Sequence, residues 1–438
     1  MDSILNSFID NNLTCISLRE KAIGDDEAIS ISNALVKNTA LINLDLGINK
    51  ISNNGITAIS HSLTTNTSLT FLDLGYNLID ANNVTAMSDL LKNNTTLKHL
   101  VLECNEISND GLISISHSLV KNTSLLSLNL EYNGITDKGI ASISNALVKN
   151  TSLEHLNFYR NKIGDHGAIL MSYSLIKNTS LIHLNLRDNK ISDKGILLLS
   201  NSLFKNTSLK YLNLCHNKLS DDGARAISKL LIKNTSLTQL EIGNDPLVFE
   251  DKKMGDDGAT FIANSLIENT SLKKLTLDDN EISDSGAEAL SYSLAKNTSL
   301  KNLDLFGNFI SENGAASISH LLMQNTTLEY INLDFNVIPD NGATSISHAL
   351  LKNTSLARLS LIQNYITIHG SSYILRALLK NTTLTNINIT ESNITNEIVA
   401  LIEHQLNINR DDIKRIKKRN DILYWHPMKL LCQKNVDI

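Results

Sequence analysis

Apolar residues recur with a fixed period along almost the whole chain. Leucine stands at the first position of each repeat from Leu13 to Leu237 in steps of 28, at Leu272 after one step of 35, and in steps of 28 again to Leu384. The repeat reads LxxLxLxxNxIxDxGxxxISxxLxxNTS, with positions 1 to 28. Position 23 is leucine and position 26 is asparagine in all fourteen repeats. The chain therefore consists of fourteen copies of one unit with a single insertion.

The spacing of apolar positions predicts one strand and one helix in each repeat. Alternation near the start of the repeat predicts a short strand that buries positions 4 and 6, such as Leu44 and Leu46, and turns positions 3, 5 and 7 outward. Positions 16, 19 and 23, such as Ile140, Ile143 and Leu147, follow the spacing of an amphipathic helix that ends near position 24.

Polar positions of the repeat predict its turns. The asparagine at position 9, such as Asn49, is expected to satisfy backbone groups of its own turn and of the neighbouring turn, which would form a ladder. Asp137 at position 13 is expected to cap the helix that follows it, and Gly139 at position 15 to open that helix. The asparagine at position 26 is expected to end the helix in the left-handed conformation.

A strand and a helix of this length cannot bury their apolar faces alone, so the repeats must stack. Strands pair about 4.8 Å apart whereas helices need about 10 Å, and this mismatch bends the stack. The predicted fold class is α/β, a horseshoe-shaped solenoid of about fourteen repeats with a parallel β-sheet on the concave face and α-helices on the convex face.

The repeat resembles the leucine-rich repeats of the ribonuclease-inhibitor class, which also form the sensor arrays of NOD-like receptors and occur in Ran GTPase-activating proteins. The resemblance covers residues 13–411 and implies a binding surface for another protein. Two features depart from these relatives: the chain has four cysteines where vertebrate inhibitors have many, and it contains no GxxxxGK[ST] motif of a nucleotide-binding domain.

The ends and the insertion divide the chain into three predicted parts. Residues 1–12 are expected to form an N-terminal capping helix, 13–411 the repeat array, and 412–438 a C-terminal capping helix and tail. The insertion at 245–253 is either a tolerated surface loop or a contact loop that presents Leu247, Val248 and Phe249. The basic run KRIKKR in the tail is either a solvated helix surface or a nuclear-import or nucleic-acid patch.

Composition narrows the partners and the compartment. The net charge is -6, which provides no general attraction for nucleic acid. The sequence shows neither a run of about 18 apolar residues nor a secretion signal, so no association with a membrane is expected. The four cysteines lie far apart without a CxxC pair, which favours a reducing cytoplasm. The chain is expected to act as a monomer, and for a microbial effector the compartment would be the cytosol of a host.

Many of the side chains that could bind a metal or catalyse a reaction occupy fixed positions of the repeat. Five histidines, His61, His117, His320, His348 and His404, occupy position 21 on the outer side of the predicted helices and lie one or more repeats apart, unlike the ligands of one metal. No nucleophile and base pair or carboxylate pair is apparent beyond what the repeat supplies. No catalytic, cofactor-binding or metal-binding residue is predicted, and the chain is not expected to be an enzyme.

Positions 3, 5, 7 and 8 vary on an otherwise regular frame and are predicted to bind a partner protein. Two patches, rich in the residue types that dominate protein interfaces, occur at these positions. The first patch consists of Phe71, Tyr76, His99, Glu103, Glu131, Tyr132, His155, Tyr159, Arg160, His183, Arg187, Tyr211 and His216. The second patch consists of Lys274, Asp278, Asp279, Asp304, Phe306, Tyr330, Asp334 and Phe335.

These observations favour a non-catalytic protein-protein interaction module: a scaffold, a sensor or an inhibitor. The resemblance also implies an alternative, a regulator of a small GTPase, although the acidic tail of the Ran-activating family is missing. A second alternative is a microbial effector that acts on a host protein, because a composition rich in Asn, Ile and Lys is typical of AT-rich genomes.

Overall fold

The computed structural model describes residues 11–81, 84–244, 253–389, 394–411 and 414. The chain falls into two compact units, Met1–Met254 and Gly255–Ile438. In the first unit the strands are β1 (Cys15–Ser17), β2 (Asn43–Asp45), β3 (Phe71–Asp73), β4 (His99–Val101), β5 (Ser127–Asn129), β6 (His155–Asn157), β7 (His183–Asn185), β8 (Tyr211–Asn213) and β9 (Gln239–Glu241). Its helices are α2 (Asp25–Leu35), α3 (Asn53–Leu63), α4 (Val84–Asn93), α5 (Ser108–Leu119), α6 (Asp137–Leu147), α7 (Asp165–Leu175), α8 (Asp193–Leu203) and α9 (Asp221–Lys233).

The second unit repeats the same alternation of helix and strand. Its strands are β10 (Lys274–Thr276), β11 (Asn302–Asp304), β12 (Tyr330–Asn332), β13 (Arg358–Ser360) and β14 (Asn386–Asn388). Its helices are α10 (Asp256–Glu268), α11 (Asp284–Leu294), α12 (Glu312–Gln324), α13 (Asp340–Leu350) and α14 (Ile368–Leu378), followed by a helical segment at 396–411.

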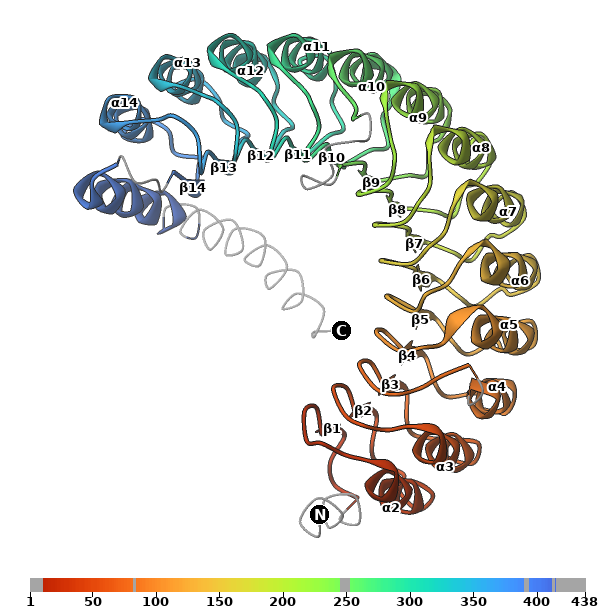
Figure 1. Cartoon of the computed structure of the whole chain (residues 1–438). Helices are drawn as coiled ribbons and strands as arrows, with labels where there is room; N and C mark the ends of the chain where they lie inside the picture. The colour runs from red at the N-terminus through yellow and green to blue at the C-terminus, as the bar shows by residue number, and fades with distance from the viewer. Residues whose placement is uncertain (1–10, 82–83, 245–252, 390–393, 412–413, 415–438) are drawn as a thin grey trace, which may run out of the picture. The chain divides into compact units, whose positions relative to one another are not determined.

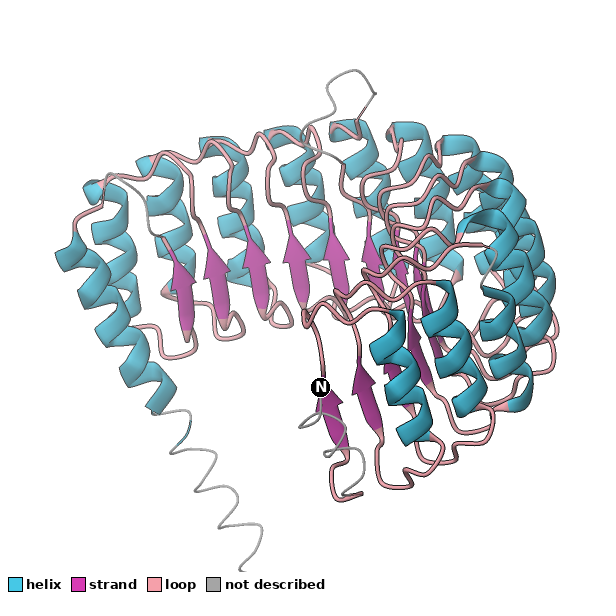
Figure 2. Ribbon diagram, turned by 60° about the horizontal axis from the view of Figure 1, so that its bottom comes forward, coloured by secondary structure: helices cyan, strands magenta, loops and turns pink. Residues whose placement is uncertain are grey.

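Within each unit every strand pairs in parallel with the strand of the next repeat (Figure 2), so that equivalent positions face each other, as for Leu156 opposite Leu184. In the first unit the strands line the inner side of an arc and the helices the outer side (Figure 1). The predicted α/β solenoid of strand–helix repeats is thus confirmed. The predicted core positions are also confirmed, since Leu44, Leu46 and Ile140 are fully buried between sheet and helices.

The asparagine ladder at position 9 forms as predicted. The Asn161 side-chain amide donates to the carbonyl of Phe158 in its own turn (3.1 Å) and to that of Leu130 in the previous repeat (3.0 Å). Its Oδ1 accepts from the backbone N–H of Ile135 at 2.9 Å. One buried amide therefore satisfies backbone groups of two repeats, which ties their turns together.

The prediction for positions 13 and 15 was wrong. Helix α8 is preceded by Ser192 at position 12, and the carboxylate of Asp165, from position 13 of the previous repeat, accepts from the N–H and hydroxyl of Ser192 (both 2.7 Å) and from the N–H of Gly195 (3.1 Å). Each such aspartate caps the helix of the following repeat. Gly195 is the third residue of its helix, where a Cβ would lie 2.8 Å from Asp165 Oδ1, so glycine permits the close approach rather than opening the helix.

The prediction for position 26 was also wrong. Asn234 and Asn325 have φ of −85° and −78°, in the extended region, so left-handed geometry does not explain this asparagine. Its side chain bridges repeats instead. The Oδ1 of Asn178 accepts from the N–H of Leu181 at 2.8 Å, and its Nδ2 donates to the carbonyl of Leu147 at 2.8 Å. The amide thus binds a carbonyl at the C-terminal end of the helix of the previous repeat, where the helix leaves it without a partner.

Several predicted segments lie outside the described residues. They comprise most of the N-terminal cap (1–10), the insertion apart from Lys253, and nearly all of the C-terminal part (412–413 and 415–438). The two capping helices and the contact loop remain predictions.

Candidate protein-binding surface

The first patch lies wholly in the first unit, and each of its thirteen residues is exposed or half-buried on the sheet face. Its residues form two rows that cross the strands. Position 3 gives a row at the start of the strands, and positions 7 and 8 give a row just beyond their ends.

Aromatic and imidazole rings follow one another in the position 3 row. The rings of Phe71 and His99 lie 6.2 Å apart, and those of His155 and His183 lie 5.4 Å apart. His183 stacks on Tyr211 with ring centres 3.9 Å apart and planes 8° from parallel. Ser127 separates the two groups of rings, so the row has two parts.

Tyrosine and arginine side chains interlock in the row at positions 7 and 8. The guanidinium of Arg160 lies 5.2 Å from the ring centre of Tyr132 and 6.0 Å from that of Tyr159. Arg187 lies 5.6 Å from the ring centre of Tyr159 and 3.1 Å from Nε2 of His216. We call these five residues the tyrosine–arginine chain.

The backbone beneath this chain is held by hydrogen bonds between repeats. The N–H of Tyr132 donates to the carbonyl of Tyr159 at 2.9 Å, and that of Arg160 to the carbonyl of Arg187 at 3.1 Å. Residues at position 8 adopt left-handed geometry, with φ of 54° for Tyr132, 52° for Arg160 and 54° for His216. The same backbone geometry therefore recurs at position 8 of these three repeats.

The part of the first patch nearer the N-terminus is acidic. Burial raises the pKa of Glu103, and the neighbouring Asp73 carboxylate raises it further, against the opposing effects of Asn129 and Arg19. Burial also raises the pKa of Glu131, and Glu103 adds to the effect. Arg19 lies 3.1 Å from Asp73 at the edge of this group. A cation from a partner would relieve the repulsion among the three carboxylates.

His183, in the position 3 row, has a lowered pKa. Burial lowers the pKa of His183 to about 4, and the adjacent His155 acts in the same direction, while Glu241 opposes them. The hydroxyl of Tyr211 donates to Glu241 at 3.0 Å, and the amide of Asn213 donates to the same carboxylate at 2.6 Å. The hydrogen bond from its hydroxyl to Glu241 therefore holds the Tyr211 ring in place against His183.

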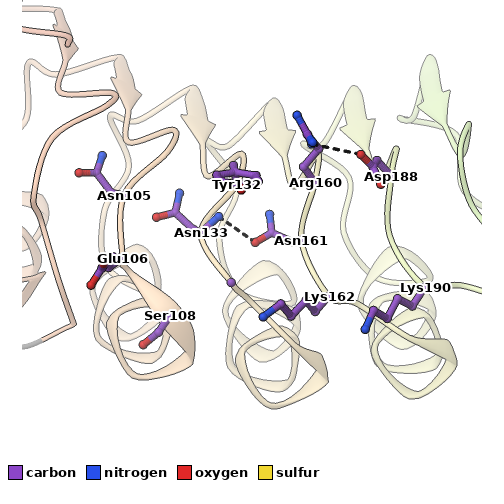
Figure 3. A pocket seen from close by; sticks show the side chains of 11 residues that line it. Asn105, Glu106, Ser108, Tyr132, Asn133, Arg160, Asn161, Lys162, Asp188 and Lys190 are labelled. Carbon is purple, nitrogen blue, oxygen red and sulfur yellow. Dashed lines mark hydrogen bonds and ion pairs between the residues drawn. The ribbon is translucent and has the colours of Figure 1, made fainter.

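An open hollow of about 670 Å³ adjoins the tyrosine–arginine chain at the turn that follows the strands (Figure 3). Tyr132 and Arg160 border it, and Arg160 Nε lies 3.3 Å from the carboxylate of Asp188. Lys162 and Lys190 line it from position 10, whereas the same position of the preceding repeat is Gly134, with φ of 69° and open space where a Cβ would lie. The missing side chain opens the hollow.

The second patch lies in the second unit and is also on the surface. The rings of Phe306 and Phe335 lie 4.8 Å apart, and Arg358 lies 4.6 Å from the ring centre of Tyr330. Burial raises the pKa of Asp304 to about 6; the backbone N–H of Phe306 opposes this, Asp278 adds to it, and Lys274 opposes it.

In the second patch, Asp334 is fixed by Ser360 and Ile362, which donate to its two oxygens at 2.8 and 2.6 Å. The patch therefore combines the exposed Phe335 and the half-buried Phe306 with several carboxylates.

Sequence reasoning missed several residues that shape these surfaces. Glu241 and Asp188 stand at positions 5 and 8, which were identified as variable, but neither aromatic character nor clustering distinguished them. Lys162 and Lys190 stand at position 10, where lysine in successive repeats was a usable signal. The hollow beside Gly134 depends on a side chain that is missing, which a search for chemical groups does not find.

Two searches of the described residues bear on other classes of site. His, Cys, Asp and Glu side chains in the described part of the chain do not form any group of three or more that could hold a metal ion. None of the helices described is long and apolar enough to cross a membrane.

Comparisons with known proteins agree with the repeat. A family model described as "Leucine Rich repeat" matches eight segments: 93–116, 121–144, 149–172, 177–200, 205–228, 268–291, 296–319 and 324–347. Successive matches begin one repeat apart and omit the repeat that carries the insertion. No curated protein matches the sequence.

Two solved structures share the fold. An internalin (inlF) from Listeria monocytogenes is similar with a TM-score of 0.51 and 23% identity, over 89% of each chain. A chain of the Rad7 and Elc1 complex in yeast is similar with a TM-score of 0.51 and 17% identity, over 91% of this chain and 90% of that one. At these identities the likeness concerns the fold alone.

Proposed function

This chain belongs to the leucine-rich repeat proteins, and on that premise we propose that it is a non-catalytic interaction module whose sheet face binds another protein. The tyrosine–arginine chain is the observation that carries the proposal. Tyrosine and arginine supply much of the binding energy in protein interfaces, and Tyr132 is 54% exposed. Because hydrogen bonds between repeats already fix the backbone, a partner would order few groups on binding.

The size of the first patch constrains how a partner binds. Five strand spacings of about 4.8 Å and five residues of about 3.3 Å give an area of about 24 by 17 Å. A stable interface buries about 800 Å² on each side, which is roughly twice that area. A partner must therefore also touch the neighbouring surface, and the hollow between Tyr132 and Lys190 is adjacent.

Charge within the first patch indicates the chemistry of the partner. Asp73, Glu103 and Glu131 favour basic groups opposite the third to fifth repeats, whereas Arg160 and Arg187 favour carboxylates opposite the sixth and seventh. The second patch, with carboxylates around Phe306 and Phe335, suits a basic and apolar segment of a partner. The proposal includes a location in the cytoplasm, which the scattered cysteines without a CxxC pair favour, and action as a monomer.

Affinity measurements on the tyrosine–arginine chain test the proposal. After the partner is identified by affinity capture, the double variant Tyr132→Ala, Tyr159→Ala should weaken its binding by about 2 kcal/mol or more, roughly 30-fold. Tyr292→Ala is the matched control, because this tyrosine lies on helix α11, outside the proposed binding surfaces, and is 61% exposed. A loss below about 0.5 kcal/mol in the double variant would place the binding site elsewhere.

A further inference from the structure

Positions 24 and 25 of the repeat, at the C-terminal ends of five consecutive helices of the first unit, α5 to α9, hold an apolar residue followed by lysine. The pairs are Val120–Lys121, Val148–Lys149, Ile176–Lys177, Phe204–Lys205 and Ile232–Lys233. Four of the apolar side chains are between 36% (Val120) and 52% (Ile176) exposed, and all five lysines are exposed. We call these ten residues the basic–apolar ridge. They lie at the helix ends, on elements that face away from the sheet patches (Figure 1).

Acidic residues are absent from the sequence around the ridge. The segments 113–123, 141–151, 169–179, 197–207 and 225–235 contain no Asp or Glu, and Lys229 adds a further cation. At the corresponding positions of the second unit, Glu268 and Gln324 interrupt the lysines Lys296, Lys352 and Lys380, so the unbroken series of five lysines lies in the first unit. A lysine at a helix C-terminus is stabilised by the helix dipole. That stabilisation does not account for the exposed apolar side chain before each lysine.

A groove accompanies the ridge where α5, α6 and α7 pack side by side. It has a volume of about 590 Å³, and its lining includes Val120, Val148, Ile176, Tyr173, Lys149 and Lys177. Further along, the ammonium group of Lys233 lies 4.8 Å from the ring centre of Phe204. The surface thus offers an apolar groove bordered by lysines across α5 to α7, and a further contact between a lysine and an apolar side chain at α8 and α9.

We propose that the basic–apolar ridge docks an acidic amphipathic α-helix of a partner protein. Neighbouring helices pack about 10 Å apart, and seven residues of an α-helix rise about 10.5 Å. A partner helix lying along the ridge would therefore place one apolar residue of each heptad against successive apolar side chains of the ridge, with its carboxylates beside the lysines. This interaction is separate from the proposed sheet interface, and either can fail without the other.

A synthetic peptide tests the proposal directly. The probe is a fluorescein-labelled helical peptide of four heptads with leucine at every seventh position and glutamate on both sides of the leucine stripe, titrated with the full chain in fluorescence anisotropy. Lys149→Glu with Lys177→Glu should weaken binding at least tenfold. The matched control reverses two lysines at the same repeat position in the second unit, Lys352→Glu with Lys380→Glu, and should change the affinity less than twofold.

A second peptide of the same composition, with its four leucines five positions apart instead of seven, tests the spacing on the unaltered chain and does not depend on how any variant folds. It should bind at least tenfold more weakly. Equal losses in the two lysine variants, or equal binding of the two peptides, would overturn the proposal because either result indicates unspecific charge attraction. Binding to phosphatidylserine vesicles with no binding to the peptide would overturn it in favour of a lipid surface.

Discussion

Position 8 of the repeat shows how single residues serve the surface at a cost to the backbone. Tyr76, Tyr132 and Phe335 all have φ near 55°, a conformation that costs a non-glycine residue roughly 1–2 kcal/mol. Glycine would avoid this cost, and the eleventh repeat uses it, at Gly307. Large side chains nevertheless occupy position 8 in most repeats, which accords with a role in display rather than in stability.

Asp304 should make stability depend on pH between about 4 and 6. Burial stabilises the protonated carboxyl, so its pKa rises from 3.8 to about 6 in the folded state. As pH rises through this window the unfolded chain has already lost the proton that the folded chain retains, and the free energy of unfolding therefore falls. The shift corresponds to at most about 3 kcal/mol. Urea unfolding at pH 4 and pH 7 should show this loss in the wild type.

The Asp304→Asn variant is the control for that measurement. Asparagine retains an oxygen that can accept from the N–H of Phe306, at 3.1 Å in the structure, but it does not ionise. Its free energy of unfolding should therefore rise relative to the wild type above pH 6. Identical pH dependence in the two proteins would show that Asp304 titrates normally.

At the scale of the helix, stability depends on a carboxylate from the neighbouring repeat. Asp165→Ala should destabilise the protein by about 1–2 kcal/mol, because the N–H groups of Ser192 and Gly195 and the Ser192 hydroxyl lose their acceptor. Hydrogen exchange should increase most at the start of α8. Thermal unfolding together with exchange measured by mass spectrometry would test both expectations.

Asp165→Asn provides the matched comparison, because the chain already contains the neutral version. Asn109 occupies the same position and accepts from the N–H groups of Thr136 and Gly139 at 2.9 and 3.0 Å. The asparagine variant should therefore retain most of the stability that alanine loses. If both variants lose the same amount, the contribution of Asp165 is its charge rather than its hydrogen bonds.

The errors made from sequence at this scale have one physical cause. In a periodic chain, a polar group at position 13 meets the start of its own helix nearby in sequence and the start of the next helix in the following repeat. Spacing alone does not say which one it binds. The residues at positions 13 and 26 were assigned to their own repeats, whereas the partners of Asp165 and Asn178 at these positions include residues of adjacent repeats. The burial of the apolar positions was predicted correctly, because burial does not depend on which repeat supplies the neighbouring side chains.

At the scale of the whole molecule, the sequence predicted which face varies but not how its residues interact. All the patch residues lie on the surface, as expected for positions 3, 5, 7 and 8. The tyrosine–arginine chain arises only because Tyr132, Tyr159 and Arg160 come into contact across repeats. Tyr211 has its hydroxyl bonded within the protein, which no periodic pattern indicated. Contacts between variable positions depend on side-chain conformation, which the repeat does not determine.

Removal of one complete repeat should leave the fold intact and damage the proposed binding surface. Deletion of residues 181–208 brings Asp165 to Ser220, Asn161 to Asn217 and Asn178 to Asn234, so every ladder finds a partner of the same type. The protein should unfold cooperatively with a midpoint within a few degrees of the wild type, as followed by circular dichroism. Deletion of 181–201 breaks the register of the repeat and should abolish that transition, and equal behaviour of the two deletions would contradict a stack held by periodic contacts. The deletion of the complete repeat removes Arg187 and places Arg160 beside His216. It should therefore lower the affinity for the partner that binds the sheet face at least tenfold, while the protein stays folded.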